Sequence, residues 1–159
     1  FIQQFFIKGI AHSSYLLGGA KTCAIIDPRR DVQTYLDAAQ DMGMQITHIL
    51  ETHLHADFIS GHMDLAEKTG AAIYVPKSAE CAFSHVGVAE GDIFTIEDMS
   101  VKVLETPGHT PEHISYVVTD RAEVKSRPPF FAATRSLSGM WAALIFSRAG
   151  RGNWPHTCM

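Results

Sequence analysis

The sequence has no long apolar run and no excess of basic residues. No stretch of its 159 residues approaches the roughly 20 consecutive apolar residues that a membrane-spanning helix needs. Lys and Arg number 13 against 17 Asp and Glu, so the net charge is −4 and no basic surface for nucleic acid or anionic lipid is expected. These absences predict a soluble protein with neither a nucleic-acid nor a membrane partner.

Cysteine is scarce, with only Cys23, Cys81 and Cys158 in the chain. An odd number without regular spacing does not form a disulfide framework and suits the reducing cytoplasm. At 159 residues and 46% hydrophobic composition, the chain is long enough for one core and too short for two comfortable domains. We therefore expect a single cytoplasmic domain, whose oligomeric state the sequence does not indicate.

Residues 51–62 contain an unusual density of metal-ligand side chains directly after an apolar strand: His53, His55, Asp57 and His62. In extended backbone His53 and His55 leave the chain on the same side, so their imidazoles can converge on one ion. Imidazole and carboxylate suit zinc, iron or manganese, which can activate water or dioxygen. An isolated His-x-His is more often a polar loop, so a second signature is needed.

Residues 105–113 supply that second signature. Pro107-Gly108 predicts a turn after another apolar strand and presents His109 at its tip. Two loops at strand ends can then meet over one ion. The predicted metal site draws on His53, His55, Asp57 and His109.

The hydrophobic pattern predicts strands interrupted by single helices, which by itself indicates only a mixed α and β fold. We expect Asp31 and Ser60 to act as helix N-caps, and Gly43 and Gly70 to end the two helices. The predicted strands cover residues 1–7, 14–17, 23–26, 46–50, 72–75, 93–96, 99–104 and 114–118.

Together, the Thr-His-x-His-x-Asp motif of residues 52–57 and the Thr-Pro-Gly-His-Thr motif of residues 106–110 resemble the metallo-β-lactamase superfamily. The resemblance implies an α+β fold, the αββα sandwich of this family, truncated in its C-terminal half. Residues 1–120 would form the N-terminal part of that domain.

Residues 121–159 lack the resemblance, including the Gly-Asp-Thr segment that carries an aspartate ligand in this family. Reading the codons of residues 132–150 one nucleotide out of register permits such a segment. We therefore predict a frameshift between Val118 and Ala132, which makes residues 121–159 an out-of-frame tail. A divergent but genuine C-terminal tail is the alternative.

Phe58 separates two branches of the family. Dinuclear hydrolases of the superfamily usually have a histidine there, and because a phenyl ring cannot bind a metal we expect a single ion. Residues 27–30, 57–62 and 110–113 resemble the persulfide dioxygenase branch. That resemblance implies Fe(II) held by His53, His109 and the out-of-frame aspartate, with His55 and Asp57 orienting ligands or bound water.

The implied reaction is oxidation of a small-molecule persulfide, such as glutathione persulfide, to sulfite. The alternative is a Zn(II) thioester hydrolase of the glyoxalase II type, with zinc on His53, His55 and His109. An inactive, frameshifted remnant is a third possibility. Asp27 is interpreted as a strand-end turn residue or as a carboxylate near the metal, and His113 as a substrate contact or a structural group.

Overall fold

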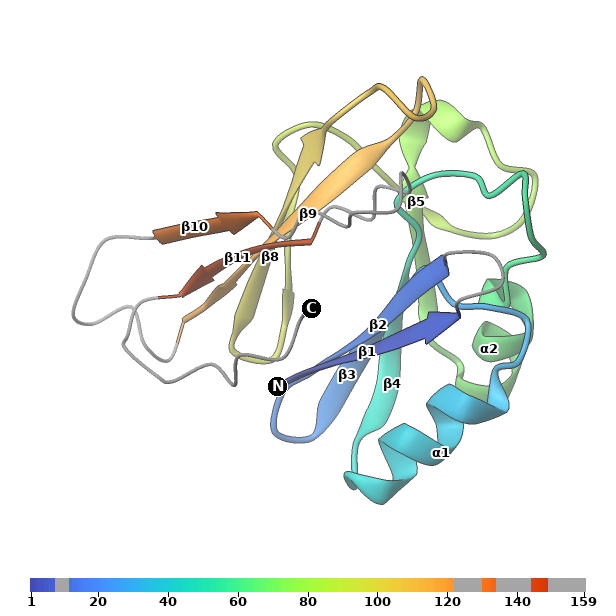
Figure 1. Ribbon diagram of the computed structural model, residues 1–159, viewed down its shortest axis with the longest axis vertical. Helices are drawn as coiled ribbons and strands as arrows, with labels where there is room; N and C mark the ends of the chain where they lie inside the picture. Colours follow the sequence, from blue (N-terminus) through green and yellow to red (C-terminus); the bar gives the residue numbers. More distant parts are fainter. Residues whose placement is uncertain (8–11, 122–129, 134–143, 149–159) are drawn as a thin grey trace.

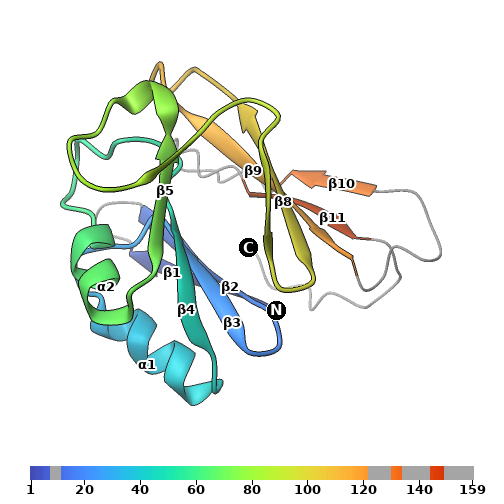
Figure 2. The same ribbon diagram turned by 180° about the vertical axis from the view of Figure 1, so that it is seen from behind.

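The computed structural model describes residues 1–7 and 12–121, together with the backbone of residues 130–133 and 144–148. Two β-sheets lie face to face, and helices α1 (Gln33–Asp41) and α2 (His62–Thr69) cover the outer face of the first sheet (Figures 1 and 2). In the described part of the chain, no helix covers the second sheet. The architecture is the expected metallo-β-lactamase sandwich.

The first sheet has its strands in sequence order, so neighbours in the chain are neighbours in space. The first three form an antiparallel meander, and the last four run parallel to one another. Because parallel strands end at the same edge, the loops after them converge there. The strands are β1 (Ile2–Ile7), β2 (His12–Gly18), β3 (Thr22–Ile26), β4 (Gln45–Leu50), β5 (Ala72–Pro76) and β6 (Val86–Val88).

The second sheet pairs in the order β10-β11-β9-β8-β7. Its first three strands in the chain are antiparallel and match the prediction. The strands are β7 (Ile93–Ile96), β8 (Met99–Glu105), β9 (Ile114–Asp120), β10 (Phe130–Ala133) and β11 (Leu144–Arg148). The last two lie in the predicted tail, whose sequence shows no strand alternation. The remainder of that tail lies outside the described residues, and so does most of the interval between Val118 and Ala132 in which the frameshift is predicted.

Alternation along the strands of the first sheet produces two cores, because successive side chains point to opposite faces. Leu16 and Ile49 pack outward against the helices, together with the fully buried Tyr35 of α1. Their neighbours Leu17 and Leu50 pack inward against the second sheet. The protein therefore has two hydrophobic cores, one between the helices and the first sheet and the other between the two sheets.

Both predicted N-caps are wrong, because each side chain has a different partner. Helix α1 is preceded by Val32 and α2 by Gly61, and neither has a side-chain cap. Asp31 accepts hydrogen bonds from Arg29 and Thr34 at 3.3 and 3.0 Å. The Ser60 hydroxyl lies 2.7 Å from the Glu51 carboxylate and accepts only a long bond, 3.4 Å, from the second helix.

Glycine sets both ends of α2. A side chain at Gly61 would collide with the Arg29 carbonyl, since an added Cβ would lie 2.2 Å from that oxygen. Gly70 ends the helix at φ 72°, as predicted, in the left-handed region that glycine adopts readily. A short 3₁₀ turn, η1 (Lys77–Ala79), follows β5. No helix in the described part of the chain combines the length and the apolar composition that crossing a bilayer requires.

Candidate metal centre

The predicted site lies where the loops after β3 and β4 meet the turn between β8 and β9. Three hydrogen bonds join the β4 loop to that turn and to β9. The backbone N–H of Ile114 donates to the Thr52 carbonyl at 2.9 Å, and the Tyr116 hydroxyl donates to the Glu51 carbonyl at 3.0 Å. The Leu54 N–H donates to the Glu112 carboxylate at 3.2 Å. These bonds bring together two motifs that are about fifty residues apart in the chain.

The imidazoles of His53, His55 and His109 gather at this edge. The ring centroid of His53 lies 4.2 Å from that of His55 and 4.9 Å from that of His109. His53 is buried, only 3% exposed, whereas His109 is exposed. The two predicted histidine signatures therefore share one place in the fold, with one imidazole at the floor and one open to solvent.

The hydrogen bonds around Thr52 define which nitrogen of His53 is available. The Thr52 hydroxyl has one proton and donates it to Asp27 at 2.9 Å, so it accepts from Nδ1 of His53, also at 2.9 Å. Nε2 then carries a lone pair, and it is buried without a hydrogen-bond partner among the described residues. Burial, the larger cause, and the nearby His55 lower the pKa of His53 to about 4, so it is neutral at pH 7.

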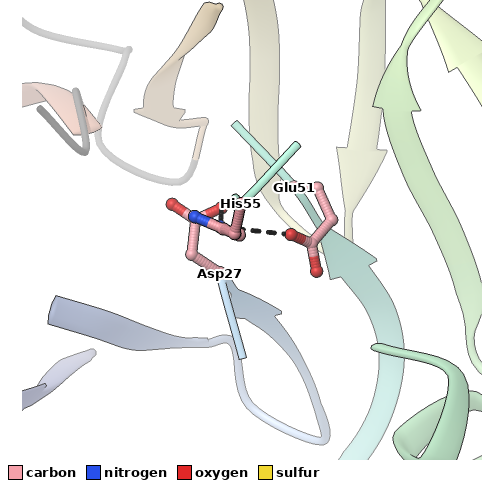
Figure 3. Close-up of side chains that lie close together, drawn as sticks. All are labelled: Asp27, Glu51 and His55. Atoms are coloured by element: carbon pink, nitrogen blue, oxygen red, sulfur yellow. Dashed lines mark ion pairs between the residues drawn. The ribbon is translucent and has the colours of Figure 1, made fainter. Parts of the chain in front are cut away.

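His55 is held at its other nitrogen. Its Nε2 lies 3.2 Å from a carboxylate oxygen of Asp27 and 3.3 Å from one of Glu51 (Figure 3). Burial alone would lower the pKa of His55, but these two carboxylates raise it to about 10. Both ring nitrogens of His55 are buried without a hydrogen-bond partner in the described part of the chain, and since Nε2 is in ion-pair contact with the two carboxylates, Nδ1 is the nitrogen left for a metal.

These two orphaned nitrogens fit a bound metal. Histidines that bind metals usually donate the other ring N–H to a carboxylate, carbonyl or similar group, which orients the ring and raises its basicity. His53 has this arrangement through Thr52, and Nε2 of His55 is in ion-pair contact with Asp27 and Glu51. Asp27, Glu51 and His55 also each offer one ligand atom, and these atoms lie within 4.8 Å of one another.

Asp27 combines both roles that its sequence left open. It ends β3 with a left-handed backbone, φ 49°, and its buried carboxylate also accepts the N–H of Thr52 at 2.7 Å. Burial alone would raise its pKa, but hydrogen bonds from His55 and Thr52 hold the pKa below its ordinary value. Asp27 is therefore ionised and ties the β3 end to the metal loop.

Asp57 and His113 contribute less directly. Asp57 is exposed and lies outside the compact group formed by Asp27, Glu51 and His55. His113 is buried with its ring centroid 5.3 Å from that of His53, and its Nδ1 lies 3.0 Å from the Thr106 hydroxyl. That contact favours the structural interpretation of His113.

The sequence analysis missed two residues of this region, His12 and Glu51, and gave no ligand role to His62, which it had noted in the histidine-rich segment. His12 is 1% exposed, and its ring packs against Phe58 at 4.2 Å. Nδ1 of His62 lies 3.3 Å from the Glu51 carboxylate. Neither His12 nor Glu51 belongs to a recognisable motif; only the position of Glu51 directly before Thr-His-x-His is a usable signal.

Comparison with known proteins identifies the class. The model of the metallo-beta-lactamase superfamily matches residues 7–123, and the chain belongs to that family. Such a fold binds metal, in agreement with the buried donor set described above.

Curated relatives include two hydroxyacylglutathione hydrolases. The one from Rhodopseudomonas palustris is 35% identical over 115 residues, which is 67% of this chain and 45% of the relative. The one from Nitrobacter hamburgensis is 35% identical over 142 residues, 79% of this chain and 56% of the relative. The chain thus spans about half the length of the curated relatives it matches.

Solved structures give two further similarities. A metallo-beta-lactamase from Staphylococcus aureus superposes with a TM-score of 0.71 and 41% identity, covering 77% of this chain and 39% of the other. ETHE1 from Myxococcus xanthus superposes with a TM-score of 0.70 and 29% identity, covering 76% of this chain and 56% of the other.

Proposed function

We propose that residues 1–120 are the N-terminal part of a mononuclear metal-dependent enzyme of the metallo-β-lactamase fold, most like a persulfide dioxygenase. The similarity to ETHE1, the branch resemblance of residues 27–30, 57–62 and 110–113, and the buried imidazole nitrogens support the proposal. In the reaction, glutathione persulfide, dioxygen and water give glutathione, sulfite and two protons. The bound Fe(II) would supply open positions for the persulfide sulfur and dioxygen.

The observation that carries the proposal is the packing of Phe58. Its ring centroid lies 4.2 Å from that of His12 and 4.3 Å from that of His55, so an apolar ring occupies the position next to Asp57. A second ion would need a donor there, as in the His-x-His-x-Asp-His motif of dinuclear hydrolases. A phenyl ring offers none, so the site favours one ion over two.

The residues of the site divide their tasks as follows. His53 and His109 would hold the metal; the aspartate that serves as third ligand in the persulfide dioxygenase branch would be encoded out of frame, and residues 121–159 contain no aspartate. His55, held by Asp27 and Glu51, would face the ion through Nδ1 or remain beside it and orient bound water. Asp57 is exposed at the rim, where it would orient water or substrate.

The aspartate matters because the chain as written has no aspartate after Asp120 that could take this place. Without this ligand, we expect metal affinity to be weaker by more than the roughly 10–100-fold that loss of an outer-shell partner causes. Iron analysis of the purified chain tests this directly. One tightly held iron per chain would contradict the loss of a ligand.

A zinc-dependent thioester hydrolase is the second candidate. The observation that favours it is the third imidazole: the ring of His55 lies 4.2 Å from that of His53 and has its own buried, unpartnered Nδ1. His53, His55 and His109 together would form a three-histidine zinc site that activates water. The 35% identity to hydroxyacylglutathione hydrolases supports the same candidate.

One pair of assays separates the candidates. The chain is reconstituted with Fe(II) or Zn(II), and oxygen uptake with sulfite release from glutathione persulfide is compared with hydrolysis of lactoylglutathione. We expect sulfite with the iron form. Thioester hydrolysis by the zinc form without sulfite would replace the proposal with the second candidate, and a metal-loaded chain inactive in both assays would indicate the inactive remnant.

A further inference from the structure

Glu51 is a buried carboxylate that the functional motifs do not include. Only 2% of the residue is exposed. One oxygen lies 3.3 Å from Nε2 of His55, and the other lies 2.7 Å from the Ser60 hydroxyl and 3.3 Å from Nδ1 of His62. Glu51 therefore connects the floor of the metal site to the start of α2.

Both sheets hold the backbone of Glu51 in place. Its N–H donates to the Tyr74 carbonyl at 2.9 Å, and its carbonyl accepts the Tyr116 hydroxyl at 3.0 Å. The first bond comes from a neighbouring strand of the same sheet and the second from the opposite sheet. With its backbone held from both sides, the carboxylate has little freedom to leave His55.

Two carboxylates hold the same ring nitrogen of His55. Asp27 already lies 3.2 Å from Nε2 of His55 and is itself held by Thr52. Glu51 adds a second carboxylate at the same ring nitrogen, so the imidazole is held by groups from two different strand ends. An ion bound at Nδ1 would therefore meet a ring whose orientation both carboxylates determine.

We infer that Glu51 is a positioning residue for the metal centre: its carboxylate holds His55 beside the ion. Ser60 and His62 orient the carboxylate from the start of α2. The inference rests on the metal site of the proposed function, but not on which reaction occurs there.

The test uses Co(II) alone as the probe, with the whole chain and its Glu51→Gln variant. Cobalt affinity and the ligand-field absorption spectrum are measured by titration, and the melting temperature is measured without metal. We expect the variant to bind cobalt about 10–100-fold more weakly, with an altered spectrum, because the second carboxylate behind His55 is gone. The loss of cobalt-binding free energy should exceed any loss of metal-free stability, which the melting temperature reports.

Two variants serve as references. Glu67→Gln changes an exposed carboxylate on α2 and should leave affinity, spectrum and melting temperature unchanged. Ser60→Ala retains the Glu51 charge but removes one group that orients it, so it should weaken cobalt binding less than Glu51→Gln. If the latter does not fold, a several-fold loss of affinity in a stable Ser60→Ala variant still supports the inference.

Other results would overturn it. Equal cobalt affinity in the original chain and both Glu51→Gln and Ser60→Ala would remove the role of Glu51, and so would a loss of affinity accompanied by an equal loss in metal-free stability. A chain that binds no cobalt would overturn it as well. Failure to form sulfite, with the cobalt results as expected, would refute the dioxygenase reaction and leave the role of Glu51 in place.

Discussion

The carboxylate of Glu112 accepts the backbone N–H of Leu54 at 3.2 Å, which joins the loop of His109 to the loop of His53. The pKa of Glu112 is lowered: burial acts to raise it, but hydrogen bonds to backbone N–H groups including that of Leu54 outweigh burial. The two halves of the candidate site thus depend on a contact between residues that are 58 positions apart in the chain.

Removing this acceptor should loosen the metal site. Glu112→Ala deletes a bond worth roughly 0.5–1.5 kcal/mol, and the loop of His109 gains freedom relative to His53. We expect cobalt affinity to fall about tenfold, as for loss of other outer-shell contacts. Isothermal titration measures this, and Glu112→Gln, which retains an acceptor oxygen, should remain within a few-fold of the original chain. Equal weakening by both variants would show that charge, not the hydrogen bond, matters.

Thr52 should contribute to stability through its hydroxyl alone. Thr52→Val keeps the shape but leaves a carboxylate oxygen of Asp27 and Nδ1 of His53 without their partner. An unsatisfied buried polar group costs about 1–3 kcal/mol, so we expect the free energy of unfolding to fall by about 2 kcal/mol. Urea denaturation of the metal-free chain measures it. Thr52→Ser, with the hydroxyl retained, should lose clearly less; an equal loss would assign the effect to the methyl group.

Replacing Phe58 should change the number of metal ions. Phe58→His removes the ring that packs on His12 and His55 and restores a donor beside Asp57. We expect equilibrium dialysis against Zn(II) to reveal an additional, weaker binding event in the variant. Phe58→Leu, which stays apolar, should bind as the original chain does. A zinc stoichiometry that is the same in all three proteins would remove Phe58 as the reason for a single ion.

Glu97 predicts a pH dependence of stability. Its carboxylate accepts the N–H groups of Ala20, Lys21 and Thr22, and these bonds, the one from Ala20 foremost, hold the pKa of Glu97 below its ordinary value. A carboxyl whose pKa is lower in the folded state stabilises the fold above its unfolded pKa, and the contribution is lost as the pH falls through the folded value.

The expected result is a melting-temperature difference that depends on pH. At pH 7, Glu97→Gln should melt below the original chain, because a neutral amide oxygen is a weaker acceptor for the turn between β2 and β3. Below the ordinary pKa of glutamate the difference should shrink and then vanish. The melting temperature of Glu90→Gln, measured at the same pH values, provides a comparison with a substitution at another exposed carboxylate. A difference that stays constant down to strongly acidic pH would contradict an ionised Glu97.

The sequence by itself determined the elements and the approximate place of the site. Alternation at Leu16-Leu17 and Ile49-Leu50 requires strands with two apolar faces, and such strands need partners on both sides. The Pro107-Gly108 turn and the closely spaced His53 and His55 are local features of the sequence, so they can be recognised without knowledge of distant residues. These features predicted the two loops that carry the histidines of the candidate site.

Tertiary structure alone decided which atoms meet. Asp27 and Thr52 are 25 positions apart, and Tyr116 and Glu51 are 65 apart, yet each pair is hydrogen-bonded. Contacts at such distances also hid Glu51 and His12 from motif analysis. The N-cap predictions failed because the side chains of Asp31 and Ser60 bond to other side chains, Asp31 to Arg29 and Thr34 and Ser60 to Glu51. Which imidazole nitrogen is left for a metal depends on such contacts, since the strand pattern sets where a side chain begins but not what its far end touches.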